Sequence, residues 1–518
     1  MSVLRRHLRR LSPWILFQAA SIRILILWIA GIVCGLAYLV LPGHIFLTLL
    51  AGGLIVVLGL AKPGITFCLM VLVFVEEMVQ FFATFANFYE VRFYPYLIPL
   101  LATTAGLTVR VAFSHERIRR TPVDLTLIAI IAFQAVSMLW APSPGVGALL
   151  VFSMMLNFLL FAVPVNILTG MDILRKVVAT WIFAGIVAAT AVILSQWIDV
   201  SSTVYLSKTT GLKFAFQEQV SRPAGLAGVD HVAGFISTAF FFALSSMVWE
   251  TRGKVKVLYL LMMAYMIYAM ILTLGRGPLI GLAVGYLFFI LIHSHFKGKV
   301  LRTTFLFFVA LATIVLIARP GYIDRMLIGF GYTGTLYFSE KETYHGTEAT
   351  TESGQGLSGM EMRKIWWVNA LREMKRHPLK MVFGLGVGGF LFYSQGSNTV
   401  PSPEVNSIIF SFFYDMGVFG LVLLIFLAYV LVSNIHYCLK NSPRDRLYYI
   451  LLGWTAAFIA EPCVHGLIDF DLTSYGAKFF WFPIGIMMAL LNLVRRSIEE
   501  ERMAAPGAVP GGGELPAA

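Results

Sequence analysis

Charged residues are scarce in this chain. Only 13% of its 518 residues are Asp, Glu, Lys or Arg, whereas 58% are hydrophobic, and the mean hydropathy is +0.81. A soluble protein of this length could not bury so much apolar surface. Apolar runs of about twenty residues recur, and each is long enough to cross a hydrocarbon core of about 30 Å. The scarcity of charge therefore predicts an integral membrane protein.

Cysteine is also rare. The chain has four cysteines, which are scattered and lack the spacing of metal ligands. We therefore expect no zinc site and no disulfide framework. We also expect no other metal site and no cofactor. Acidic residues are outnumbered, which gives a net charge of +12. The basic residues sit mainly in short segments between apolar runs, where they set membrane topology. The excess of positive charge therefore predicts contact with membrane lipids and no nucleic-acid partner.

The apolar runs predict an all-α, polytopic fold with about fourteen transmembrane helices. The predicted spans are 22–41, 44–61, 64–85, 95–112, 123–140, 147–168, 174–196, 229–249, 255–274, 278–294, 302–318, 406–433, 446–464 and 475–494. The segment 1–21 carries arginines among leucines, which predicts a basic amphipathic helix on the membrane surface. The segment 495–518 is rich in Ala, Pro and Gly and predicts a disordered tail.

The basic residues also predict the sides of the membrane. The distribution of Lys and Arg in short loops determines the orientation of a membrane protein, and here it predicts that both termini lie in the cytoplasm. Helices 1–11 then occupy 22–318, a large outer loop occupies 319–405 with a helix near 360–377, and three more helices occupy 406–494. In this arrangement several polar residues that are far apart in sequence meet at the outer face.

Two arginines lie where an anion site is expected. Arg276 stands in the run Leu274-Gly275-Arg276-Gly277-Pro278, between long apolar segments. A charge near membrane depth is kept when it is paired, lines a wet cavity or binds a ligand. Arg222 lies in a segment rich in Gly and Pro, close to His231. The alternatives are an interfacial anchor for Arg276 and structural pairing for Arg222.

Two further groups lie at predicted outer ends of spans. Glu404 precedes Asn406, which we expect to cap a helix. Glu404 is a candidate base, although a carboxylate is also favoured beside a helix N-terminus. His465 stands four residues before Asp469, a spacing that allows the carboxylate to orient the ring. The alternative for this pair is a buried structural hydrogen-bond network.

The large loop contains an ordered part. Residues 360–371 show helical spacing of apolar residues, and Arg363 lies on this predicted helix. The run Gly384-Leu385-Gly386-Val387-Gly388 follows Pro378. It is not a dinucleotide fingerprint, because no strand–helix unit surrounds it. We interpret it as a turn that carries the chain back to the membrane.

These motifs, in this order around one large loop, resemble the O-antigen ligase/polymerase superfamily of bacterial envelope glycosyltransferases. The similar segments are Arg222-Pro-Ala-Gly with Asp230-His231, Leu272-Thr-Leu-Gly-Arg276-Gly, Arg363 to Trp366 leading to Gly384-Leu-Gly-Val-Gly388, Asn406-Ser407 through Gly417 to Gly420-Leu421, and His465-Gly-Leu-Ile-Asp469-Phe. The resemblance covers about residues 120–490.

The resemblance implies a bacterial inner-membrane enzyme that acts at the periplasmic face without metal. It implies a glycan donor on undecaprenyl diphosphate and a glycan or lipid acceptor. Arg222 and Arg276 stand where family arginines are thought to hold the donor diphosphate, and we include Arg363 from a matching motif. Guanidinium groups suit this role because they bind phosphate in a bidentate manner. Asn406, His465 and Asp469 are expected to support the site.

One departure bears on the chemistry. Ligases of this family typically carry His-Asn where this chain has Val405-Asn406. The missing histidine is the proposed activator of the acceptor hydroxyl, so Glu404, His231 or His345 is expected to substitute. The departure leaves both ligase and polymerase activity open. A transporter or flippase of lipid-linked glycans and a non-catalytic assembly partner are the alternative functions.

Overall fold

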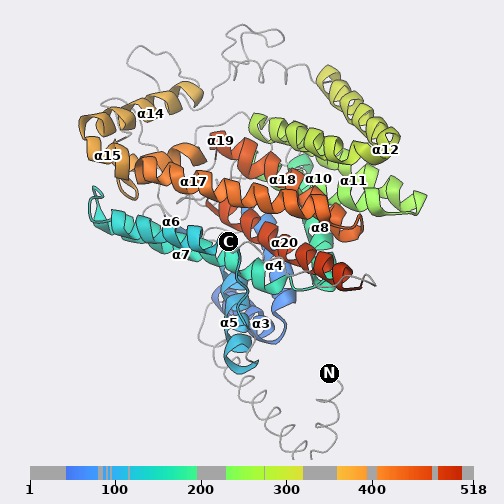
Figure 1. The fold of residues 1–518 in the computed structure, drawn as a ribbon, viewed down its shortest axis with the longest axis horizontal. Coiled ribbons are helices and arrows are strands. Elements are labelled where there is room, and N and C mark those ends of the chain that lie inside the picture. The colour runs from blue at the N-terminus through green and yellow to red at the C-terminus, as the bar shows by residue number, and fades with distance from the viewer. Residues whose placement is uncertain are drawn as a thin grey trace, which may run out of the picture.

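A computed structural model describes residues 43–79, 86–88, 91–93, 96–114, 117–194, 229–273, 275–318, 359–393, 405, 407–469 and 477–504. Within these ranges the elements are helices, apart from one short antiparallel hairpin that pairs Ala86 with Phe93. The elements are α3 (Gly43–Ala61), α4 (Pro63–Val79), β1 (Ala86–Phe88), β2 (Val91–Phe93), α5 (Leu97–Ser114), α6 (Asp124–Ser137), α7 (Pro144–Ile167), α8 (Met171–Leu194), α10 (Val229–Trp249), α11 (Gly253–Thr273), α12 (Arg276–Ala318), α14 (Gly359–Arg376), α15 (Pro378–Phe383), α16 (Gly389–Tyr393), α17 (Ile408–Asn441), α18 (Arg446–Phe458), the π-helix η1 (Ile459–His465), α19 (Gly466–Asp469) and α20 (Lys478–Ala504), as Figure 1 shows.

The helices are those of a multi-pass membrane protein. In the described ranges, seven are long and apolar enough to cross a membrane, and six shorter apolar helical segments accompany them. The prediction of a helical membrane fold is therefore confirmed. Each predicted span from 44–61 onward overlaps an apolar helix. The span 22–41 lies outside the described residues, and the count of fourteen stays a prediction.

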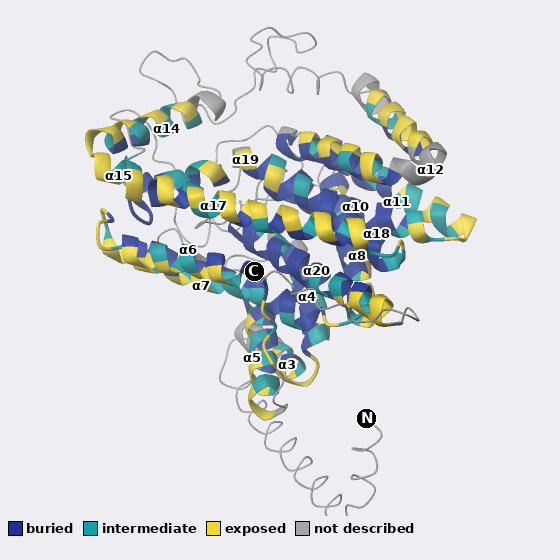
Figure 2. Ribbon diagram, viewed as in Figure 1, coloured by how far each residue is buried: buried dark blue, intermediate teal, exposed yellow. Residues whose placement is uncertain are grey.

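Burial separates a central group of helices from a peripheral one. In α10, 83% of the apolar stretch that could cross a membrane is buried inside the protein, whereas in α17 the corresponding share is 28%. Figure 2 shows exposed residues along α6, α7 and α17 and buried residues along α10, α18 and α20. Trp181 of α8 joins the core, because its ring contacts Phe235, Trp454 and Phe482 from three other helices. The exposed apolar side chains of the peripheral helices suit contact with lipid tails.

Helix α12 differs from the two separate spans predicted for its range. The helix is continuous from Arg276 to Ala318, and Figure 1 draws it as two arms joined at a bend. The rings of Tyr286 and Phe305 lie 6.0 Å apart, and those of Tyr286 and Phe308 lie 6.5 Å apart. Nineteen residues of straight helix would span about 28 Å. The two arms therefore fold back on each other, and the predicted loop between them is helical.

Helix α17 begins one residue later than the predicted cap implies. Its N-cap is Ser407, which has extended backbone angles, whereas Asn406 lies outside the described residues. Ser and Asn are both favoured N-caps, so residue type alone does not decide between neighbouring positions. The same helix is kinked at Gly417, where φ is 67°. A Cβ there would lie 2.4 Å from the carbonyl oxygen of Val382, so only glycine fits.

Candidate functional site

Helices α10 and α12 begin at the end of the bundle where η1 finishes. On α10, a Cβ at Gly234 would lie 2.3 Å from Glu461 Oε2, whereas Gly453 of α18 faces Phe241 further along α10. On α12, Gly281 faces Ala460 and Gly285 faces Ala456. As residue numbers rise along α10 or α12, the numbers of the facing residues on η1 and α18 fall. Both helices are therefore antiparallel to α18 and η1. We call this region, marked by His231, Arg276, His465 and Lys478, the site end.

Helix α20 also begins at the site end. The ring of Phe479 stacks on His231, with centroids 4.9 Å apart and 11° between the ring planes. Lys478, the first residue of α20, is only 3% exposed. Its ammonium lies 5.7 Å from the ring centroid of Tyr96 and 5.3 Å from that of Phe479. A buried cation with aromatic contacts, absent from the sequence prediction, therefore joins the predicted residues.

A buried acid–histidine pair lies at the centre of this end. His465 Nδ1 is 2.9 Å from Glu461 Oε2, and the two residues are 0% and 4% exposed. Glu461 Oε1 is also buried and has no hydrogen-bond partner among the described residues. Both residues lie on η1, which contains Pro462. Single π-helical turns are frequent at functional sites, and the pair places titratable groups inside a membrane helix.

His465 has a carboxylate partner that the sequence did not single out. Glu461, four residues before the histidine, contacts Nδ1, and the predicted pairing with Asp469, four residues after it, stays a prediction. The two spacings are equal, and sequence offers no reason to prefer one. The backbone of Asp469 ends α19, and its side chain lies outside the described residues.

A second layer, formed by α14, α15 and α16, packs on the start of α17. The indole Nε1–H of Trp367 donates to the carbonyl of Val405 at 2.9 Å. The hydroxyl of Tyr414 donates to the carbonyl of Trp367 at 2.7 Å, and the rings of Trp367 and Phe410 lie 4.5 Å apart. Arg363 stands one helical turn before Trp367 and therefore shares its face of α14. These contacts hold Val405 beside the helix that carries Arg363.

The glycine-rich segment forms the turn that holds this layer in place. Gly384, Gly386 and Gly388 have φ values of 81°, 84° and 72°, a region that side chains other than glycine rarely adopt. The turn lies against α6, because the N–H of Val387 donates to Ser137 Oγ at 2.9 Å. It also reaches α17, where a Cβ at Gly384 would lie 2.3 Å from the backbone of Asp415. The turn thus links the second layer to two membrane helices.

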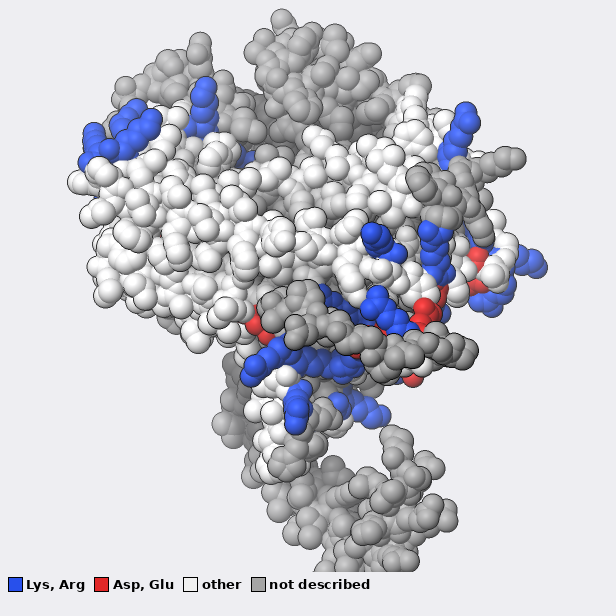
Figure 3. All heavy atoms as spheres, in the orientation of Figure 1, with Lys and Arg blue, Asp and Glu red and all other residues white. Residues whose placement is uncertain are grey.

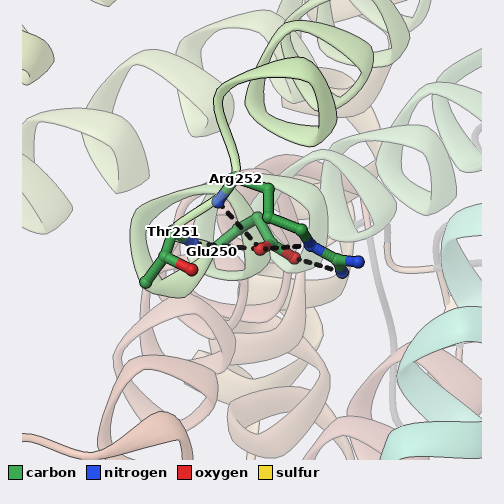
Figure 4. A network of polar contacts seen from close by, with 3 residues as sticks. All are labelled: Glu250, Thr251 and Arg252. Carbon is green, nitrogen blue, oxygen red and sulfur yellow. Dashed lines mark hydrogen bonds and ion pairs between the residues drawn. The ribbon is translucent and has the colours of Figure 1, made fainter.

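The opposite end of the bundle has a different character. The turn after α10 contains Glu250, whose carboxylate accepts bonds from the Arg252 side chain and from the N–H of Thr251 (Figure 4). The Arg252 hydrogen bonds lower the pKa of Glu250 to about 2. Figure 3 shows Lys and Arg toward the end where α20 finishes and over α14 and α15, with a broad uncharged surface between. An apolar band between charged ends is typical of a membrane protein.

The structure places some of the predicted site residues and leaves others outside its description. His231 is half-buried on α10, Arg363 is half-buried on α14, and His465 is fully buried on η1. Only the backbone of Arg276 is described, as the first residue of α12. Arg222, Glu404 and Asn406 lie outside the described residues.

Sequence reasoning missed two residues at the site end, Glu461 and Lys478. Glu461 carried a usable signal, because it stands one helical turn before a histidine inside an apolar run. Lys478 also carried one, because it is a lysine at the start of an apolar span. Neither signal shows by itself which helices surround the residue.

Comparison with known proteins supports the resemblance seen in the motifs. A search of curated proteins gives no match. Residues 261–425 match the sequence model of the O-antigen ligase family. The matched range includes most of α11, all of α12, the second layer and the start of α17 through its kink. It therefore includes Arg276, Arg363 and Val405. The match suggests a multi-pass membrane glycosyltransferase of the O-antigen ligase type and supports the assignment of this chain to the O-antigen ligase/polymerase superfamily.

Proposed function

We propose that this protein transfers an undecaprenyl-diphosphate-linked oligosaccharide or polysaccharide to a glycan or lipid acceptor. The supporting observation is the convergence of α10, α12, η1 and α20 at the site end. There Phe480 of α20 lies 5.9 Å from Phe412 of α17, the helix on which the second layer with Arg363 packs. The family match covers the two helical elements that begin with Arg276 and contain Arg363. We place the reaction at this end because α12 begins there at Arg276 and because His231, Glu461 and His465 lie there.

The donor diphosphate is the group that the arginines bind in this proposal. Arg276 begins α12, and the start of a helix carries partial positive charge that favours an anion. Arg222 and Arg363 complete the predicted set. A guanidinium fork binds two phosphate oxygens at once and stabilises the charge that develops on the leaving diphosphate. Arginine at these positions therefore serves both binding and departure of the leaving group.

The acceptor hydroxyl attacks the anomeric carbon of the donor sugar. The bond from that carbon to the diphosphate oxygen breaks, and the diphosphate leaves with the electron pair. The hydroxyl proton needs an acceptor, and the sequence offers Glu404 and His231 for this role. Asn406, His465 and Asp469 support the site. Valine at position 405 leaves polymerase activity, in which the acceptor is another lipid-linked glycan, as open as ligase activity.

The proposal places the site end at the periplasmic face of the inner membrane, with both termini in the cytoplasm. Cysteines introduced at Ser353 and at Ser442 then label differently with a thiol reagent that does not cross the membrane. Labelling is expected at Ser353 in intact cells and at Ser442 only after permeabilisation. Equal labelling of the two positions in intact cells would contradict this topology.

Arg276 provides the direct test of donor binding. Arg276→Ala and Arg276→Lys are both expected to reduce transfer severely with little change in protein level, because lysine keeps the charge but loses the planar fork. Arg302→Ala, at an exposed position on the second arm of α12, is the matched control. Full transfer by Arg276→Lys would show that guanidinium binding of the diphosphate is wrong.

A further inference from the structure

The pair of Glu461 and His465 packs against α10, the helix that carries His231. Glu461 lies one helical turn deeper in the bundle than His465, and Nδ1 of the ring faces its carboxylate. Gly234 of α10 packs directly against this contact, because a Cβ at position 234 would lie 2.3 Å from Glu461 Oε2 and 3.5 Å from His465 Nδ1.

His231 lies on the same face of α10, one turn nearer the site end than Gly234. Residues three apart on a helix have Cβ atoms about 5–6 Å apart. The Cβ of His231 thus lies within roughly 9 Å of His465 Nδ1. Two imidazole side chains span this distance directly or through one water. Unlike His465, His231 is only half-buried, so it is the histidine of the two that an acceptor reaches.

We propose that Glu461 and His465 are positioning residues that receive, through His231, the proton released in transfer. This inference rests on the proposed function and names the route of its proton. His231 takes the hydroxyl proton while the acceptor oxygen bonds to the anomeric carbon and the diphosphate departs with its electron pair. The proton then passes to His465 Nε2, and water later removes it.

The electrostatics of the buried pair favour this direction. Glu461 and His465 are buried, and in a setting of low dielectric a carboxylate beside a neutral ring leaves one negative charge uncompensated. An isolated buried charge is costly. Uptake of one proton by the ring turns it into an ion pair without net charge, with both partners already 2.9 Å apart.

The test measures transfer by the full-length protein in membranes, with the lipid-linked glycan that accumulates in a strain lacking this chain as donor. His231→Ala is expected to lower kcat by about 10²- to 10⁴-fold. Glu461→Gln is expected to lower kcat by a smaller factor with KM for the donor unchanged, because only the proton route is affected. Glu461→Asp, which keeps the carboxylate, is expected to recover part of the loss.

The double variant separates a proton route from a structural role. If both residues serve one route, His231→Ala with Glu461→Gln is no slower than His231→Ala alone. Multiplying losses overturn the proposal, because independent structural defects add in free energy. His293→Gln is the matched control, since His293 is a buried histidine at the far end of the first arm of α12, in ring contact with Tyr449. This control is expected to retain transfer.

Two further outcomes keep the proposal decidable. If Glu461→Gln does not accumulate, normal transfer by His231→Ala alone still overturns the inference, and a large loss in Glu404→Gln beside it assigns the proton to Glu404. Arg276→Ala reports on the proposed function separately. Normal consumption of the donor by Arg276→Ala refutes donor binding at this end. If Arg276→Ala no longer consumes the donor while Glu461→Gln and His465→Asn keep a normal kcat, only the proton route is refuted.

Discussion

The contact between Gly281 and Ala460 offers a way to move the start of α12 without touching a polar residue. A Cβ at position 281 would lie 2.2 Å from the carbonyl oxygen of Ala460, whereas ordinary contacts of this kind lie at 3.4–4 Å. Gly281→Ala therefore forces α12 and η1 apart by about 1 Å. Overpacking of this kind typically costs about 1–3 kcal/mol in the free energy of unfolding.

The displacement matters because Arg276 lies close to the contact. Five residues separate it from Gly281, which is about 7.5 Å along a helix, so a shift of α12 moves the start of the helix relative to His465. A misplacement of about 1 Å can cost about 10²-fold in rate. We expect Gly281→Ala to lower transfer by a factor of that order while the protein still accumulates, because alanine also gains about 1 kcal/mol in helix propensity.

The assay is transfer of the lipid-linked glycan in membranes, together with thermal unfolding of the purified protein. Gly253→Ala is the matched control, because nothing lies within 4 Å of a Cβ at the start of α11. Gly285→Ala is expected to resemble Gly281→Ala, since its Cβ would lie 2.5 Å from the carbonyl oxygen of Ala456. Transfer by Gly281→Ala that equals that of Gly253→Ala would refute the view that packing of α12 on η1 positions the site.

Two predictions concern the second layer. Trp367→Phe removes the donor to the buried Val405 carbonyl but keeps an aromatic ring. It should destabilise the protein by about 1–3 kcal/mol and lower transfer, and an unchanged thermal midpoint would contradict this. The hydrogen bond from Lys380 holds the pKa of Glu373 below its usual value, so the stabilisation is complete above the unfolded pKa and is lost as pH falls through the lowered one. The thermal midpoint of Glu373→Gln should therefore fall less between pH 7 and pH 3 than that of the unaltered protein. Equal falls would contradict stabilisation of the protein by the hydrogen bond between Lys380 and Glu373.

Properties that depend on the local sequence could be predicted. The apolar runs locate the helices, because a bilayer requires long apolar segments whose backbone groups are satisfied within the helix. The glycines at 384, 386 and 388 predict a turn for a similarly local reason. The helix α14, from Gly359 to Arg376, follows the spacing of its apolar residues and ends just before the His377-Pro378 step.

Properties that depend on tertiary packing could not be predicted. The contact of Glu461 with His465 is one example, because α10 brings Gly234 against the Glu461 carboxylate, and sequence alone does not show that α10 packs there. Rings from the two arms of α12 meet across its bend, and hydropathy does not report such contacts. Lys478 is buried because Tyr96 and Phe479 flank it, and residue 96 is remote in sequence.

Reconstitution of the purified protein into vesicles with the lipid-linked glycan donor tests the central claim most directly. Donor extracted from a strain that lacks this chain is supplied with the acceptor, and free undecaprenyl diphosphate is measured over time. A transferase of this type releases undecaprenyl diphosphate and lengthens or modifies the acceptor, and Arg276→Ala abolishes both. Donor that crosses the bilayer intact, with no release of undecaprenyl diphosphate, would contradict the account and identify a flippase.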